Sequence, residues 1–465
     1  MKYELLSIFS CFILSFCLII GLIQCDQGAD STYDRASEES AQIIGTACDS
    51  LVMRPHLPSD VDTLNQSCAN AFAWQSFLAV TWPASEKRAG QPDSTVSIDD
   101  YGNPDYMQPM TWGTFKSVEE IFKPNPPDDW NAHHEKIMSE HEQAGDCGRP
   151  LNNMHKINKS EGAMEEMYQA SLKGTPWLTD QDSNIVWYEI KVNNTEFDYI
   201  VDNDFYDPKA QLDSSRNGSG IWLPEGSMEV KAAWRIIPEE KLSTLKKRYR
   251  VVKACVPSSV DTSQHPPVFK AYREQYLGLI GLHLAQKVPS SPQLLWATFE
   301  HVDLAPVQGK EVDKSKDYAL FNPDCANCPV NRVPKTGETP LNKPSQIKKH
   351  KDATPGKEAM RLNDFVHKKL KAANPNSVFQ YYKLVNVQWP EQPVSDGENK
   401  RTVPLADGDK TPEVMTNVSL ETYKQDLSCL TCHRHSTISK NGQPNIKDFG
   451  AGYSFIFARA VPQEE

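Results

Sequence analysis

The chain has 465 residues, of which 24% are charged and 39% hydrophobic, and its formal net charge is −12. This composition is typical of a globular protein with one large domain or two or three ordinary ones, and past the first residues it argues against membrane-spanning segments. The acidic balance also argues against nucleic acid as a partner.

The first 25 residues have the pattern of a bacterial export leader. Lys2 precedes an apolar run, and Cys25 is followed at once by an acidic, polar stretch over residues 26–45. A cysteine in this place indicates a lipoprotein, with lipid on Cys25 and the polar stretch as a flexible tether. Because Gln24 is larger than the residue usual before such a cysteine, simple cleavage and a retained anchor stay open. All three alternatives place the chain in the bacterial cell envelope, on its periplasmic side.

Residues 46–330 combine helix and strand patterns. Residues 69–82 carry apolar side chains at roughly helical spacing up to Pro83, and residues 112–123 repeat them every three positions. Later segments are β-branched and aromatic and are separated by Asn, Gly and Pro, which predicts strands. They cover residues 184–203, 226–237, 248–256 and 294–303. An α+β region is expected, with a mostly antiparallel sheet flanked by helices.

Residues 331–360 are rich in Pro, Lys and Thr and have no apolar period, which predicts a long basic loop. Its lysines form either an ordinary solvated loop or a docking surface for an acidic redox partner. A C-terminal region over residues 361–465 follows. Within it, residues 378–390 read as a strand, and residues 417–427 read as a helix with Asn417 or Ser419 as its N-cap.

The cysteines fit an oxidising compartment. Six of the 11 lie outside both the leader and the pair at residues 429 and 432, and they allow three disulfides in fifteen connectivities. They are Cys48, Cys68, Cys147, Cys255, Cys325 and Cys328. Cys48 is predicted to pair with Cys68, since the two flank one short segment, and Cys325 to pair with Cys328 or with a distant partner.

The stretch DLSCLTCHRHSTI, residues 426–438, contains Cys429, Cys432 and His433 in the order Cys-x-x-Cys-His. With 11 cysteines and 12 histidines in the chain, chance gives this pattern roughly 0.007 times per chain. The spacing lets two sulfurs bond the vinyl groups of a haem while the imidazole binds the iron. The alternatives are a short disulfide, or a zinc site completed by Cys325 and Cys328. Since Pro329 follows that second cysteine pair, one covalent haem c is predicted.

The ligand on the other face of the iron must come from upstream, because no methionine follows Met415. Met415 or His301 is the predicted distal ligand. The other candidates are Met360, His283 and His367. If none of them binds, the iron has an open position, which favours a catalyst or sensor over an electron carrier.

Six segments together resemble large exported bacterial proteins described as cytochrome c family proteins. They are AWQSFLAVTWP, WGTFKSVEEIF, EVKAAWRI, LWATFEHVD, NPDCANCPVN and ETYKQDLSCLTCH, spread over most of residues 69–459. The resemblance implies a single covalent haem at Cys429, Cys432 and His433, in a cytochrome c-like helical segment. It implies no particular reaction.

Three functions are therefore compared. The first is an exported monohaem c-type cytochrome that transfers electrons to or from a redox partner protein in the envelope, with the membrane reached through the N-terminal lipid or anchor. The second is a haem-dependent oxidoreductase, with an open iron site or a pocket in the N-terminal region that the haem supplies with electrons. The third is a non-redox envelope protein in which the cysteines only cross-link the fold.

Overall fold

The structure is a computed structural model. The export leader, the tether, Cys25 and Cys48 lie outside the residues it describes, so the predictions about them stay predictions. In the described part, no helix is both long enough and apolar enough to cross a bilayer. The described residues are 51–61, 64–132, 177–261, 268–325, 327–334, 344–391, 410–439 and 449–464.

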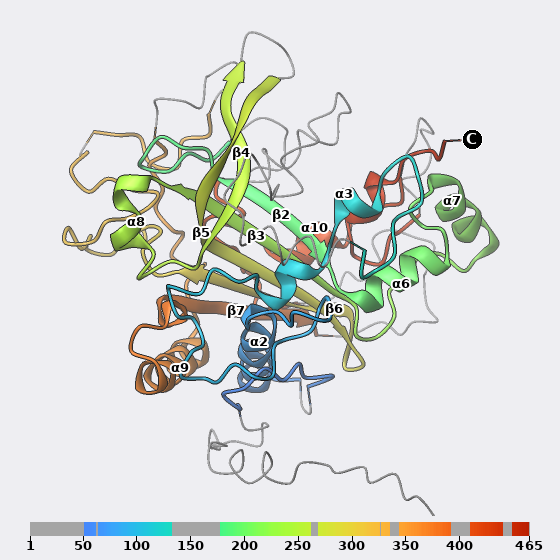
Figure 1. Cartoon of the computed structure of the whole chain (residues 1–465), viewed down its shortest axis with the longest axis horizontal. Coiled ribbons are helices and arrows are strands. Elements are labelled where there is room, and N and C mark those ends of the chain that lie inside the picture. Colours follow the sequence, from blue (N-terminus) through green and yellow to red (C-terminus); the bar gives the residue numbers. More distant parts are fainter. Residues whose placement is uncertain are drawn as a thin grey trace, which may run out of the picture. The chain divides into compact units, whose positions relative to one another are not determined.

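An eight-stranded sheet organises the described chain, and its strand pairings are antiparallel (Figure 1). The strand order is β1-β2-β3-β5-β6-β7-β8, and β4 pairs with β5 beside this path. The α+β class with a mostly antiparallel sheet is thus confirmed. The strands are β1 Lys116–Ser117, β2 Trp187–Val192, β3 Met228–Ile237, β4 Val251–Asp261, β5 Val268–Val288, β6 Ser291–His301, β7 Tyr382–Pro390 and β8 Lys410–Thr411.

Two helices, α2 (Gln66–Thr81) and α9 (Lys357–Ala373), lie side by side on one face of the sheet (Figure 1). Trp74 of α2 donates its indole N–H to Asn363 Oδ1 of α9 at 2.9 Å. Nearly every residue of α2 is buried, as expected of a helix that is apolar all round. The helix predicted over 69–82 and its stop before Pro83 are confirmed.

The opposite face of the sheet carries the C-terminal part of the chain. Here α6 (Asn194–Asp202), α7 (Pro208–Asn217) and the short α10 (Cys429–His433) bury apolar side chains in one cluster. Because β7 pairs with β6, sequence regions 46–330 and 361–465 build the same sheet. The remaining helices are α3 Val118–Ile121 and α8 Glu239–Leu245, with 3₁₀ turns at Thr111–Thr114, Val378–Tyr381 and Ile456–Arg459.

Several boundaries differ from the sequence prediction. The expected strand over 184–203 ends at Val192, because Asn193 caps α6 by accepting a hydrogen bond from the Glu196 backbone N–H. The expected helix over 112–123 is reduced to a 3₁₀ turn and the single turn of α3. The strand prediction also missed β5 entirely, which is the longest strand described.

The basic loop is less exposed than predicted. Lys349 is buried with 1% exposure and pairs with the equally buried Glu300. Lys348 is half-buried, with its ammonium over the ring of Phe321. Lys348 and Lys349 are therefore not part of an exposed docking surface, and the prediction is wrong for these two lysines. Lys335 and Lys343 lie outside the described residues.

Candidate functional site

The helix α10 is the Cys-x-x-Cys-His motif itself. Ser428 caps it by accepting a hydrogen bond from the Thr431 backbone N–H. Leu430 is buried on the sheet, and its backbone N–H donates to Gln388 Oε1 of β7 at 3.0 Å. The side chain of Leu430 and this hydrogen bond together fix α10 against the edge of the sheet.

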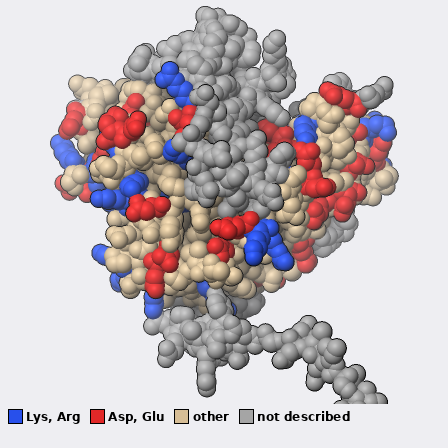
Figure 2. Space-filling view, in the orientation of Figure 1, with Lys and Arg blue, Asp and Glu red and all other residues tan. Residues whose placement is uncertain are grey.

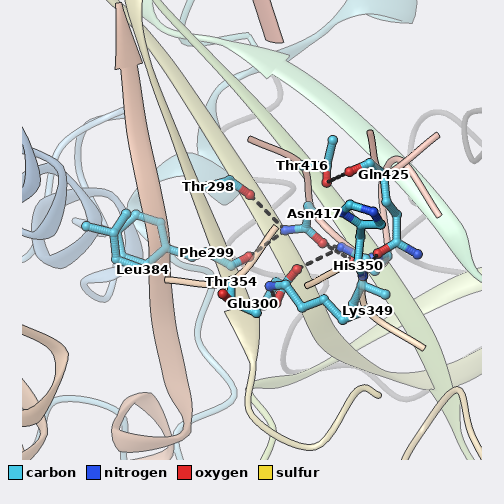
Figure 3. Close-up of polar contacts among 12 residues, drawn as sticks. Thr298, Phe299, Glu300, Lys349, His350, Thr354, Leu384, Thr416, Asn417 and Gln425 are labelled. Atoms are coloured by element: carbon cyan, nitrogen blue, oxygen red, sulfur yellow. Dashed lines mark hydrogen bonds and ion pairs between the residues drawn. The ribbon is translucent and has the colours of Figure 1, made fainter. Parts of the chain in front are cut away.

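The segment leading to α10 is attached to β6 rather than helical, so the helix predicted over 417–427 is wrong. Asn417 Nδ2 donates to Thr298 Oγ1 at 2.9 Å and to the Phe299 carbonyl at 2.8 Å, as Figure 3 shows. The Val418 backbone N–H donates to Glu300 Oε1 at 2.7 Å. These bonds use groups that a helix start would need, and tertiary contacts decide the local structure here.

Close approach of this segment to the sheet requires a glycine on β5. A Cβ at Gly281 would lie 2.1 Å from Ser419 Oγ and 2.9 Å from Asn417 Oδ1. No side chain fits in that space without moving the segment. Gly281 therefore sets how closely the chain before α10 packs on the sheet.

His433 is held by its surroundings in one orientation. Its ring lies between Trp296, at 4.1 Å between centroids, and Phe455, at 5.0 Å. Nδ1 lies 2.8 Å from the Tyr453 carbonyl oxygen, which can only accept, so Nδ1 donates and carries the proton. Nε2 is thereby left with its lone pair. Burial is the largest cause that lowers the pKa of His433 to about 3, and the nearby Lys231 and His283 act in the same direction.

Cys429 and Cys432 are free thiols with intermediate exposure. Burial raises the pKa of both, and the carboxyl group of Glu421 adds to the effect. Thiols of this kind are neutral and are poor nucleophiles compared with the thiolates of catalytic cysteines. Their arrangement fits covalent modification by an attachment machinery better than a thiol-based active site.

The structure excludes one of the alternatives to a haem site, the zinc site made from two cysteine pairs. Cys325 and Cys328 form a disulfide, so they cannot complete a zinc site with the motif. Among the described residues, no group of three or more His, Cys, Asp or Glu side chains is arranged to hold a metal ion. Cys68 is disulfide-bonded, and its predicted partner Cys48 lies outside the described residues.

The two predicted distal ligands differ in their surroundings. Met415 is buried in the same apolar cluster as Leu430, with Cys429 packed against that cluster. The ring of His301 stacks on the ring of Tyr249, with 3.8 Å between centroids. Both ring nitrogens of His301 also have hydrogen-bond partners. Its Nε2 lies 3.1 Å from the Arg248 carbonyl, and its Nδ1 accepts from the Asp303 backbone N–H at 3.2 Å. His301 is thus a hydrogen-bonded core histidine without a nitrogen free for iron.

Polar side chains next to the motif were not singled out as a group from the sequence. Lys231 of β3 and His283 of β5 are register partners, and Glu421 lies beside His283. Burial raises the pKa of Glu421 to about 7 and lowers that of His283 to about 3. The sequence did contain a signal for this group, because Glu229 and Lys231 occupy every second position of an otherwise apolar strand. Such spacing places both side chains on the same face of the sheet.

A buried pair of carboxyl groups lies at the end of the same sheet face. Glu196 of α6 and Glu229 of β3 face one another, and Glu229 also interacts with the Ser454 side chain. The two carboxyl groups also hydrogen-bond to one another, which requires a proton on one of them. Burial, together with repulsion between the two carboxylates, raises the pKa of Glu196 well above its ordinary value. The pair therefore retains, at pH values above about 4.3, a proton that the glutamates of an unfolded chain would already have released.

Glu196→Gln is expected to stabilise the fold increasingly as the pH rises above about 4.3, the ordinary pKa of glutamate. In the wild type the raised folded-state pKa gives stability that is present at low pH and lost as the pH rises, by up to about 1.4 kcal/mol per pH unit and group. Glutamine keeps the shape and has no proton to lose. Urea unfolding at about pH 5 and about pH 8 measures the difference.

The exposed Glu225→Gln is the matched control and should shift both midpoints equally. A Glu196→Gln effect that is the same at both pH values would contradict the shared-proton account.

Comparison with known proteins adds no relative: no family model, no curated protein and no solved structure matches the chain.

Proposed function

We propose that this chain is an exported monohaem c-type cytochrome. It carries one haem bonded to Cys429 and Cys432, with His433 as an axial iron ligand, and transfers electrons in the bacterial cell envelope. The large α+β body holds the haem-binding segment in place, in line with the resemblance to cytochrome c family proteins.

The hydrogen bond from His433 Nδ1 to the Tyr453 carbonyl is the observation that carries this proposal. An iron-binding histidine usually donates its other ring N–H to a carbonyl or carboxylate, which fixes the tautomer and the ring orientation. His433 has this arrangement, and its Nε2 makes no hydrogen bond within the described chain. A histidine that happened to follow two cysteines would have no need of it.

The haem, when bound, supplies a one-electron ferric–ferrous couple. The protein's contribution is to hold its ligands and to limit water. Trp296 and Phe455 restrict rotation of the His433 ring, and Leu430 anchors the two cysteines on the sheet. Burial in an apolar cluster lowers the local dielectric, which is one of the ways a protein sets a haem potential.

A redox partner would meet an acidic surface near this segment. Asp198, Asp202, Asp204 and Asp213 are exposed on or next to α6 and α7, and Figure 2 shows acidic side chains gathered over these helices. The buried sides of both helices belong to the same apolar cluster as Leu430. A partner with a basic docking face suits this surface better than the acidic partner considered from the lysine-rich loop.

The test is a pyridine haemochrome spectrum with a haem-stained denaturing gel, on full-length protein expressed in a host that matures c-type haem. A covalent c-type signal at one haem per chain is the expected result. Protein that is folded and exported but carries no covalent haem would reject the proposal and favour the non-redox, cross-linked envelope protein.

A further inference from the structure

His283 lies on the sheet face that receives the C-terminal segment. The residue is on β5 and is only 9% exposed. Its Nε2 is buried and has no hydrogen-bond partner among the residues that the structure describes. Glu421 Oε2 lies 3.5 Å from this nitrogen, which is too far for a good hydrogen bond. A buried ring nitrogen without a partner is unfavourable, so each such atom calls for an explanation, for example a ligand that binds it.

His283 is also close to the His433 ring. His283 pairs with Thr298 in the β5–β6 register, and Trp296, two residues before Thr298, points to the same face. Trp296 is the residue whose ring packs on His433. Diagonal neighbours on one face of a sheet lie about 7–8 Å apart, so His283 and the Trp296 ring that packs on His433 lie in the same part of this face.

The other candidates from the sequence are less suitable. Both nitrogens of His301 are bound to backbone groups, and His367 Nε2 lies 2.6 Å from the Tyr382 carbonyl. Met360 is on α9 with 48% exposure, on the opposite side of the sheet. Met415 is near the motif, but its thioether lies in an apolar cluster, where sulfur needs no polar partner.

We infer that His283 is the second axial ligand of the haem iron, so that the iron is bound by two histidines, His433 and His283. The inference rests on the proposed function, since it requires a haem at the motif. An iron bond would satisfy the buried nitrogen of His283. Two histidine ligands also leave no open position, which favours electron transfer over catalysis at the iron.

The experiment compares ferric wild-type protein with His283→Ala by electron paramagnetic resonance and near-infrared magnetic circular dichroism. The wild type should show a low-spin ferric haem with two histidine ligands. His283→Ala should keep its covalent haem, become almost wholly high-spin, and return to low-spin when imidazole is added. His283→Met should keep a low-spin haem and gain the near-infrared band of a methionine–iron bond.

Two matched controls separate ligation from packing. Met415→Leu and His367→Ala should retain the wild-type spectrum. A His283→Ala protein that stays low-spin, or a Met415→Leu protein that becomes high-spin, would overturn the inference while leaving the covalent haem intact. If His283→Ala does not fold, an unchanged spectrum in His283→Met overturns the inference as well. Absence of covalent haem in the wild type is a different result, because it rejects the proposed function itself.

Discussion

The Cys429→Ala/Cys432→Ala double variant is expected to lose all covalently bound haem in a host that matures c-type haem. Each thiol can form one thioether bond to a haem vinyl group, and with both removed no bond to the chain remains. The single variant Cys432→Ala should show weak attachment or none. Haem-stained denaturing gels, normalised to the amount of exported protein, measure the effect, since denaturation removes haem that is not covalently bound.

The fold itself should tolerate this change. Both thiols are free and only partly buried, so replacing them removes little packing and breaks no disulfide. The control is Cys325→Ala/Cys328→Ala, which removes the disulfide described above and should leave the haem in place. Full haem staining of the first double variant would show that the haem, if present, is attached elsewhere.

His433→Ala separates attachment from iron binding. The cysteines remain, so part of the covalent haem should remain too, but the low-spin spectrum of the wild type should be lost. The Tyr453 carbonyl would lose the His433 donor in this variant, so the stability of the variant is measured alongside its spectrum. A His433→Ala protein with the wild-type spectrum would exclude His433 as the ligand.

Local patterns predicted the elements whose own residues decide their structure. The helix α2 follows from its apolar content and from Pro83, and β3 and β6 follow from β-branched and aromatic runs. Where a cap decided the outcome, the pattern was less informative. The strand before Asn193 and the helix after it have similar compositions, and the single side chain of Asn193 separates them.

The candidate site was predicted only in the part that is local in sequence. Cys429, Cys432 and His433 lie within five residues, so their spacing alone carries the chemistry. The groups around them come from β3, about two hundred residues earlier, and from β5, about 150 residues earlier, and they pair through sheet register. A sequence shows that His283 exists, but it does not show that the Nε2 of this histidine lacks a partner or that Trp296 brings it near His433.

Lys349→Met is expected to lower the free energy of unfolding by about 3–5 kcal/mol, because it leaves the carboxylate of Glu300 buried and unpaired. Glu300 and Lys349 are each 1% exposed, and the other oxygen of Glu300 accepts from the Val418 backbone N–H. Figure 3 shows the pair where the segment leading to α10 meets β6. Urea unfolding at neutral pH measures the change.

The large loss comes from breaking the pair, not from a strong net contribution of the intact pair. Burial lowers the pKa of Lys349 to about 8 even beside the carboxylate of Glu300, so desolvation outweighs the attraction between them. The double variant Glu300→Gln/Lys349→Met, which keeps an acceptor for Val418, should therefore recover much of the stability. Lys348→Met, at a half-buried neighbour, should cost less than about 1 kcal/mol. If Lys349→Met and the double variant are equally unstable, the lost packing of the lysine, rather than the unpaired buried charge of Glu300, accounts for the instability.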